Sequence, residues 1–179
     1  LTISNYLFNF ITVPYQTRVL GPEIYGRLGF AAAFIVYFQL ILDFGFILSG
    51  TSEVAKNKDN KHELSKIMTS IVIIKFILIV FSLLAIIFLS NMIPYLKENL
   101  FLVILYFINC ATTSLLPDYL YRGLEDMKII TYRTLVVKFS FSIMIFVFLQ
   151  DKTQYFYVPV LNIIGSVGAV WFVYLHVVK

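Results

Sequence analysis

The chain has few charged residues, and this scarcity bears first on the solvent in which it can fold. Charged side chains make up 13% of its 179 residues, whereas an ordinary soluble domain has about 25%. Hydrophobic residues make up 60%, so little polar surface is available to cover a fold of this size in water. The balance excludes a soluble globular protein and favours one that folds in a lipid bilayer.

Residues that build metal centres and active sites are also scarce. The one cysteine, Cys110, cannot form an internal disulfide and is interpreted as a small packing residue. His62 and His176 lack any accompanying metal-ligand pattern. The triplet Asp43-Phe44-Gly45 spells a kinase motif, but no Gly-rich loop, catalytic-loop sequence or nucleophile elbow accompanies it. Four acids fall in loops too short for an active site: Glu53, Asp118, Glu125 and Asp126. We therefore expect no enzyme activity, no metal and no cofactor.

Long hydrophobic blocks are the dominant feature that is present. A block of about 20 apolar residues crosses a ~30 Å hydrocarbon core as a helix. Six such blocks predict transmembrane helices at residues 1–19, 25–50, 64–89, 100–121, 129–149 and 154–178. Short segments with turn signals separate them, so neighbouring helices should be antiparallel. The sequence predicts an all-α fold, a polytopic helical bundle in which residues 1–179 form a single transmembrane domain.

The two ends of the chain lie at hydrophobic blocks. Leu1 stands inside the first block, and Lys179 follows directly on the sixth. No initiator methionine, cationic leader or small-residue cleavage site precedes the first block, so a signal peptide does not explain it. We expect the sequence to be a fragment of a longer, transporter-like chain.

The lysines and arginines predict the orientation in the membrane. Eight belong to the second, fourth and last connections: Lys56, Lys58, Lys61, Lys66, Arg122, Lys128, Arg133 and Lys179. The other connections hold four: Arg18, Arg27, Lys97 and Lys152. Because positive charge is enriched on the cytoplasmic side, the N-terminus should be cytoplasmic. The basic residues are scattered along loop ends rather than gathered on one face, which argues against nucleic-acid binding.

Three charged residues lie inside the hydrophobic blocks: Asp43, Lys75 and Lys138. Counted from the cytoplasmic helix ends, they lie roughly 10, 16 and 13 Å deep. An unpaired charge there costs about 2.5–3.5 kcal/mol even on lenient scales, so each should face protein or water. Either lysine could instead reach the headgroups along its apolar stem. For Asp43, a structural ion pair with Lys75 is the alternative to a functional role. Two lysines against one acid leave a positive excess, which suits a phosphate or pyrophosphate.

Uncharged polar residues recur on single faces of several blocks. Thr131, Thr134, Lys138 and Ser142 share a face of the helix over 129–149. The first block carries Asn5, Asn9, Thr12 and Gln16, which also share one helix face. Further polar positions are Gln39, Asn109, Thr112, Thr113, Asn162 and Ser166. These stripes predict a bundle around a hydrated cavity, although such residues also join membrane helices by hydrogen bonds. Pro14 and Pro117 could kink their helices.

Four segments carry a resemblance to a known family. They are Asn5-Tyr-Leu followed by Val13-Pro-Tyr-Gln-Thr-Arg-Val-Leu-Gly-Pro-Glu-Ile-Tyr-Gly26, then Asp43-Phe-Gly45, Gly50-Thr-Ser-Glu-Val-Ala55, and Pro117-Asp-Tyr-Leu-Tyr-Arg-Gly-Leu-Glu-Asp-Met-Lys128. In this order and at these positions they resemble bacterial polysaccharide flippases, the O-antigen or repeat-unit transporters of the MATE-like MOP superfamily. The similarity covers nearly the whole chain. It implies that the six helices form the N-terminal bundle of a longer transporter with two such bundles.

The resemblance also implies a function. It is the translocation of an undecaprenyl-diphosphate-linked oligosaccharide across the bacterial cytoplasmic membrane by alternating access, coupled to an ion gradient. Partners would be this lipid-linked substrate and membrane lipid, with a polysaccharide polymerase and a chain-length regulator as candidates. Lys138 and Lys75 would attract the diphosphate, and Arg18 would guard the outer mouth or meet the diphosphate on release. The polar residues Asn5, Asn9, Thr12, Gln16 and Thr134 would line the cavity, and Asp43 would tune Lys75 or couple an ion. The alternatives are a drug or metabolite exporter of the same superfamily and a non-transporting scaffold of a glycan assembly complex.

Overall fold

The computed structural model describes the backbone of residues 2–177 and the side chains of Phe8 and residues 10–175. Within this range the chain is helical and contains no strand. Its elements are α1 (Thr2–Leu42), α2 (Phe46–Lys56), α3 (Lys61–Met92), α4 (Pro94–Glu98), α5 (Leu100–Ser114), α6 (Asp118–Gly123), α7 (Met127–Phe148), the short 3-10 helix η1 (Lys152–Gln154) and α8 (Tyr157–Val177).

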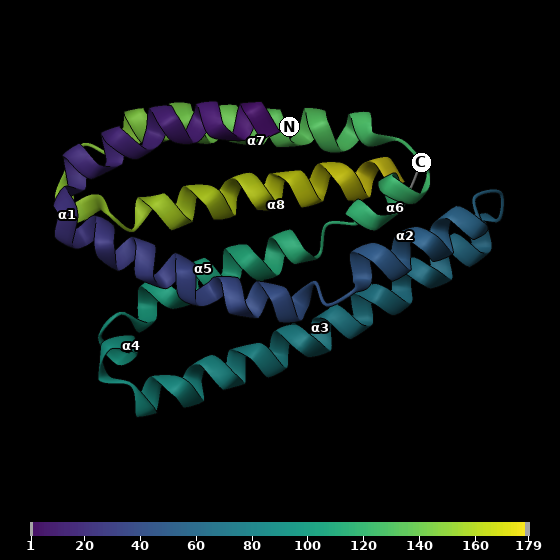
Figure 1. The fold of residues 1–179 in the computed structure, drawn as a ribbon, viewed down its shortest axis with the longest axis horizontal. Coiled ribbons are helices and arrows are strands. Elements are labelled where there is room, and N and C mark those ends of the chain that lie inside the picture. Colours follow the sequence, from purple (N-terminus) through teal and green to yellow (C-terminus); the bar gives the residue numbers. More distant parts are fainter. Residues whose placement is uncertain (1, 178–179) are drawn as a thin grey trace.

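Five helical stretches of the described residues are long and apolar enough to cross a membrane. The first of them, Phe10–Lys56, includes both arms of α1, which bend apart at Gly21. Figure 1 shows the bend at one end of the molecule, with the chain running toward it along the first arm and away from it, on the same side, along the second. Many large apolar side chains point outward, as expected where lipid is the solvent. The predicted all-α, polytopic bundle is confirmed.

The bend in α1 has a local cause in the pair Gly21-Pro22. Gly21 has φ 77° and ψ 166°, a combination that is essentially restricted to glycine. The proline ring that follows favours an extended residue before it and a helix start after it. The first two predicted helices therefore meet at a sharp corner without a loop. Pro14 lies inside the first arm, and the backbone around it stays helical.

The helix expected over 25–50 is interrupted in the structure. The second arm of α1 ends at Leu42 and α2 begins at Phe46, with the turn Asp43-Phe44-Gly45 between them. Gly45 has φ 71°, a left-handed conformation that costs other residues roughly 1–2 kcal/mol. The prediction of one continuous helix was wrong here because an apolar run does not reveal a single left-handed glycine.

The helix expected over 100–121 is also interrupted. Pro117 has no N–H and disfavours the helical conformation at Leu116, so α5 ends at Ser114 and α6 begins at Asp118. The Asp118 N–H turns back to the Leu116 carbonyl at 2.9 Å, and side chains from other helices satisfy the carbonyls at the end of α5. Lys75 of α3 donates to the Ser114 carbonyl, and the Tyr174 hydroxyl of α8 donates to the Leu115 carbonyl at 3.2 Å. Broken membrane helices require such replacement donors.

The described residues form three hydrophobic clusters, two of which lie on either side of these interruptions. The larger hydrophobic cluster joins α1, the later part of α3, α5, α7 and α8. A smaller cluster joins α2 and α6 to the first turns of α3, around Val54, Ile71, Tyr119 and Leu120. Figure 1 shows α2, α6 and the α2–α3 turn together at one end, with the α1 bend and α4 at the other. The two helix breaks therefore lie where the larger cluster gives way to the smaller one.

Candidate functional site

Two partly open cavities lie in the described part of the bundle and share one wall. Each has a volume of about 350 Å³. The residues common to both are Thr113, Val137, Lys138 and Ser166. We call the first the charged cavity, because its lining also includes Asp43, Lys75, Asp118 and Arg133. We call the second the amide cavity, because its lining also includes Gln16, Asn109 and Asn162.

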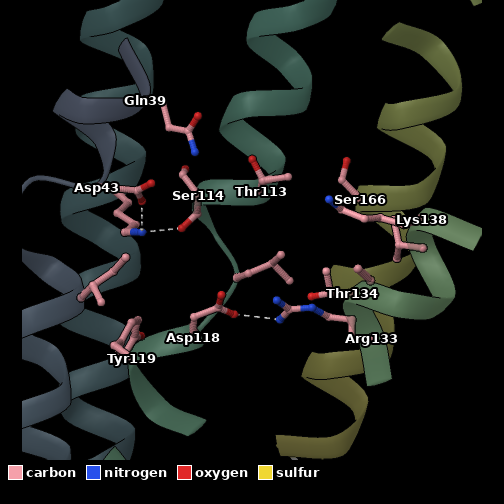
Figure 2. A pocket seen from close by; sticks show the side chains of 15 residues that line it. Gln39, Asp43, Thr113, Ser114, Asp118, Tyr119, Arg133, Thr134, Lys138 and Ser166 are labelled. Carbon is pink, nitrogen blue, oxygen red and sulfur yellow. Dashed lines mark hydrogen bonds and ion pairs between the residues drawn. The ribbon is translucent and has the colours of Figure 1, made fainter. Parts of the chain in front are cut away.

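The ion pair between Asp43 and Lys75 lies on one side of the charged cavity. Lys75 Nζ is 3.1 Å from Asp43 Oδ1, and the same ammonium donates to the Ser114 carbonyl. The Lys75 side chain is only 4% exposed, whereas Asp43 is 27% exposed. Figure 2 shows both interactions converging on the Lys75 nitrogen. Lys75 thus connects the two helix interruptions, since Asp43 follows α1 and Ser114 ends α5.

A second ion pair lies across the charged cavity, between α6 and α7. Arg133 Nη1 donates to Asp118 Oδ1 at 2.8 Å, with the arginine side chain 7% exposed and the aspartate 30% exposed. Asp118 is placed there because it is the first residue of α6, directly after Pro117. Arg133 lies within α7, well past its first residue Met127. Figure 2 shows Arg133 on the Thr134 side of the cavity and Asp118 beside Tyr119, with the ion pair spanning the space between them.

Lys138 occupies the wall between the two cavities. Within the described residues it forms no ion pair, although it lines both spaces. The charged cavity therefore has three basic residues, Lys75, Arg133 and Lys138, against the acids Asp43 and Asp118. Since each acid is paired with one of the other two bases, the positive excess is centred on Lys138.

The amide cavity combines hydrogen-bonding groups with aromatic rings. Gln16 and Thr12 of α1 are buried and face a lining that includes Asn109 of α5 and Asn162 of α8. Three aromatic residues belong to the same lining: Phe8, Tyr106 and Phe141. The buried Ser142 hydroxyl also lines it and has no hydrogen-bond partner within the described residues. Amide groups beside aromatic faces suit a ligand that carries both hydroxyl groups and apolar faces.

The structure brings most of the predicted site residues to these two cavities. Lys75, Asp43 and Thr134 line the charged cavity, Thr12 and Gln16 line the amide cavity, and Lys138 lines both. Arg18 is exposed near the α1 bend and belongs to neither lining. Asn5 and Asn9 lie outside the residues whose side chains are described.

Arg133 and Asp118 are the cavity residues that the sequence analysis assigned to loops. Both stand close to predicted helix ends, where charged residues ordinarily meet water. The one sequence signal for their place in the cavity was Pro117, directly before Asp118. A helix break at this proline changes the path of the chain, so that the residues after it can pack against the bundle instead of continuing into a loop. Within the described residues, no group of three or more His, Cys, Asp and Glu side chains could hold a metal ion.

Comparisons with known proteins agree with a membrane location for this site. The model of a family described as "Polysaccharide biosynthesis protein" matches residues 1–179. A protein of Escherichia coli (strain K12) named "Putative O-antigen transporter" is 30% identical over 152 residues, which cover 84% of this chain and 36% of that protein. A protein of the same name from Shigella dysenteriae is 31% identical over 154 residues, which cover 84% of this chain and 38% of that protein. The chain thus spans less than two fifths of either relative. No solved structure matches it significantly.

Proposed function

The chain belongs to the family of polysaccharide biosynthesis proteins, and on that basis we propose that it forms one bundle of a membrane transporter for lipid-linked oligosaccharides. The substrate would be an undecaprenyl-diphosphate-linked repeat unit, moved from the cytoplasmic to the outer leaflet. Relatives named as O-antigen transporters support a transport role of this kind. Because the chain spans only part of their length, a second bundle would come from the remainder of the protein.

The observation that carries the proposal is the position of Lys138. Lys138 lines both the charged cavity and the cavity of amides and aromatic rings. A lipid-linked oligosaccharide has the same two chemistries, an anionic diphosphate joined to a sugar. We propose that Lys138 binds the diphosphate as a point charge, with Thr134 beside it. Thr12 and Gln16, continued by Asn5 and Asn9, would then hydrogen-bond the sugar hydroxyls.

The remaining residues would act during the transport cycle. Arg18, exposed near the α1 bend, would meet the diphosphate on release at the outer mouth. Asp43 and Lys75 lie where two helices are interrupted, and interruptions of this kind border the cavities of alternating-access transporters. Asp43 would couple an ion, or the pair would hold the two interruptions together. The charged cavity would bind a cationic drug weakly, because its basic residues outnumber its acidic ones.

The test is the Lys138→Ala variant of the full-length protein, compared with Lys128→Ala. Lys128 is exposed at the start of the same helix and lines neither cavity, so it is a matched control. Hydrogen bonds to charged groups contribute about 1.5–3 kcal/mol, so Lys138→Ala should weaken diphosphate binding by roughly 10- to 100-fold. Surface glycan should fall accordingly while membrane abundance stays unchanged. Normal glycan export by Lys138→Ala would overturn the proposal.

A non-transporting scaffold is separated from a transporter by water access. Cysteines placed at Asn9 and Lys138 of the full-length protein, with Cys110 replaced by alanine, should react with a water-soluble maleimide if these positions line a transport cavity. The absence of reaction at both positions would favour a scaffold. A cysteine at Phe81, which is 67% exposed on the apolar face of α3, supplies the lipid-facing control.

A further inference from the structure

Arg133 has hydrogen-bonding capacity that the protein leaves unused. A guanidinium offers five N–H donors in a planar fork. In the described residues, Nη1 donates to Asp118 Oδ1 and no other donor of Arg133 has a protein acceptor. The other cavity ion pair differs, because the Lys75 ammonium has two oxygen partners, one from Asp43 and one from Ser114. Arg133 is therefore held by one contact, and Lys75 is enclosed by two.

The position of Arg133 makes this capacity available to a ligand. Arg133 lines the charged cavity together with Lys138, and both belong to α7. Figure 2 shows the Arg133 guanidinium on the same side of this space as Thr134 and Lys138. An anion bound at Lys138 would therefore meet the unused guanidinium donors within the same cavity.

A carboxylate and a phosphate compete for the same guanidinium donors. Arginine binds either group by two parallel hydrogen bonds when the geometry allows, but Asp118 makes only one such bond to Arg133. The diphosphate could accept two bonds and carries two negative charges, against one on the carboxylate. Without any anion beside it, a guanidinium that is 7% exposed would be costly to bury, so a partner is needed when the cavity is empty.

We infer that Arg133 is a second ligand for the diphosphate group. In the empty cavity Asp118 forms the ion pair with the Arg133 guanidinium, and the diphosphate displaces Asp118 when it binds. The inference rests on the proposed function, since it assumes that the anion bound at Lys138 is a diphosphate. It adds a residue and an exchange step to that site. Because Asp118 begins α6 and Arg133 lies in α7, the exchange also removes an ion pair between these two helices.

The decisive experiment measures binding of inorganic pyrophosphate and of undecaprenyl diphosphate to the purified full-length protein by titration calorimetry. Asp118→Asn removes the competing charge while keeping the side-chain size. It should tighten the binding of both probes, by about three- to tenfold for an exchange that releases one partly exposed ion pair. Arg133→Gln should weaken binding, and Asp118→Asn should give no gain when Arg133→Gln is also present.

An ion pair with a merely structural role gives the opposite sign. Asp118→Asn would then lower the melting temperature and leave the affinity unchanged or weaker, which would overturn the inference. If Asp118→Asn does not fold, Asp118→Glu and Arg133→Lys decide: Asp118→Glu should bind as the wild type does, and Arg133→Lys should bind more weakly. Unchanged affinity in Arg133→Lys and Arg133→Gln would overturn the assignment.

The same titrations distinguish failure of this inference from failure of the proposed function. Wild-type binding that depends on Lys138 but does not respond to changes at Asp118 or Arg133 overturns only the exchange. Wild-type protein that binds neither probe, or binds both independently of Lys138, overturns the diphosphate site itself and the exchange with it.

Discussion

Lys75 is the most enclosed charged side chain for which the structure describes an ion pair, and its surroundings indicate what it stabilises. Its ammonium contacts Asp43 Oδ1 and the Ser114 carbonyl, and lies 5.7 Å from the centre of the Phe46 ring. These three partners belong to the ends of three different helical segments, so one cation connects the interruption after α1 to the interruption after α5. Removing a single partner would leave a charge or a carbonyl buried without compensation.

At this residue scale we predict unequal effects of the two neutralising substitutions. Asp43→Asn should destabilise the folded protein by about 3 kcal/mol, the lower end of the range for broken buried pairs, because Asp43 is 27% exposed. Lys75→Met should cost somewhat less, because the acid that it leaves behind reaches water and only the Ser114 carbonyl stays buried without its donor. The double variant should recover most of the loss, and melting temperatures of the purified full-length protein provide the measurement.

The double variant also separates the two roles of Asp43. If stability and glycan export both recover, the pair is a structural tie between the helix breaks. If stability recovers while export does not, Asp43 acts in ion coupling. Additive destabilisation, with no recovery in the double variant, would contradict a direct interaction between the two side chains.

The cavity residues were predictable to the extent that a charge inside an apolar run is conspicuous. Asp43, Lys75 and Lys138 each interrupt such a run, and all three line the charged cavity. Arg133 and Asp118 line it too, but each stands near a predicted helix end, where positive-inside bias and loop polarity explain a charge equally well. Their pairing depends on the path that the chain takes after Pro117, and residue spacing alone does not reveal that path.

At the element scale, α6 packs against α2 through Gly123. A Cβ atom at this position would lie 2.5 Å from Val54 Cγ1 and 2.9 Å from the Thr51 carbonyl oxygen. Because Val54 is completely buried and the Thr51 contact is backbone, neither neighbour can move aside easily. The close approach of α2 and α6 therefore depends on the absence of a side chain at position 123.

We predict that Gly123→Ala destabilises the protein by roughly 1–3 kcal/mol, the usual cost of overpacking a core. Gly168→Ala is the matched control, because Gly168 lies within α8 and a Cβ there meets nothing within 4 Å. The control should be neutral or gain up to about 1 kcal/mol in helix propensity. Equal melting temperatures for the two variants would contradict the close packing of α6 on α2.

The helices themselves were predictable because a hydrophobic block of about 20 residues has few alternatives in a bilayer. The interruptions at Asp43–Gly45 and Leu115–Pro117 were harder to predict. The average hydrophobicity of a segment says nothing about the backbone angles of single residues within it. Their stability depends on distant residues, Lys75 and Tyr174, which satisfy the carbonyls at the end of α5. Partners that are 39 and 59 residues away in sequence cannot be identified from local composition.

At the scale of the whole molecule, the two ends of the bundle differ in charge. The end formed by the α2–α3 and α6–α7 connections carries most of the basic loop residues, including Lys56, Lys58, Lys61 and Lys66. Lys58 also bonds Glu125 across these two connections at 2.8 Å, and this hydrogen bond from the lysine holds the pKa of the Glu125 carboxyl below its usual value. The opposite end has the α1 bend, α4 and η1, with fewer basic residues.

We predict that the lysine-rich end faces the cytoplasm, because lysines and arginines are retained on that side during insertion. Two single-cysteine variants of the full-length protein, Asp59→Cys and Glu98→Cys, test this after Cys110→Ala removes the native thiol of this chain. Both positions are exposed, Asp59 in the α2–α3 turn and Glu98 at the end of α4. A difference in labelling would therefore report the side of the membrane and not the exposure of the residue. In cells whose outer layer has been made permeable while the cytoplasmic membrane stays intact, a membrane-impermeant maleimide should label Glu98→Cys. It should label Asp59→Cys only after the cytoplasmic membrane is opened. The reverse pattern would contradict this orientation and place the α2–α3 and α6–α7 connections outside.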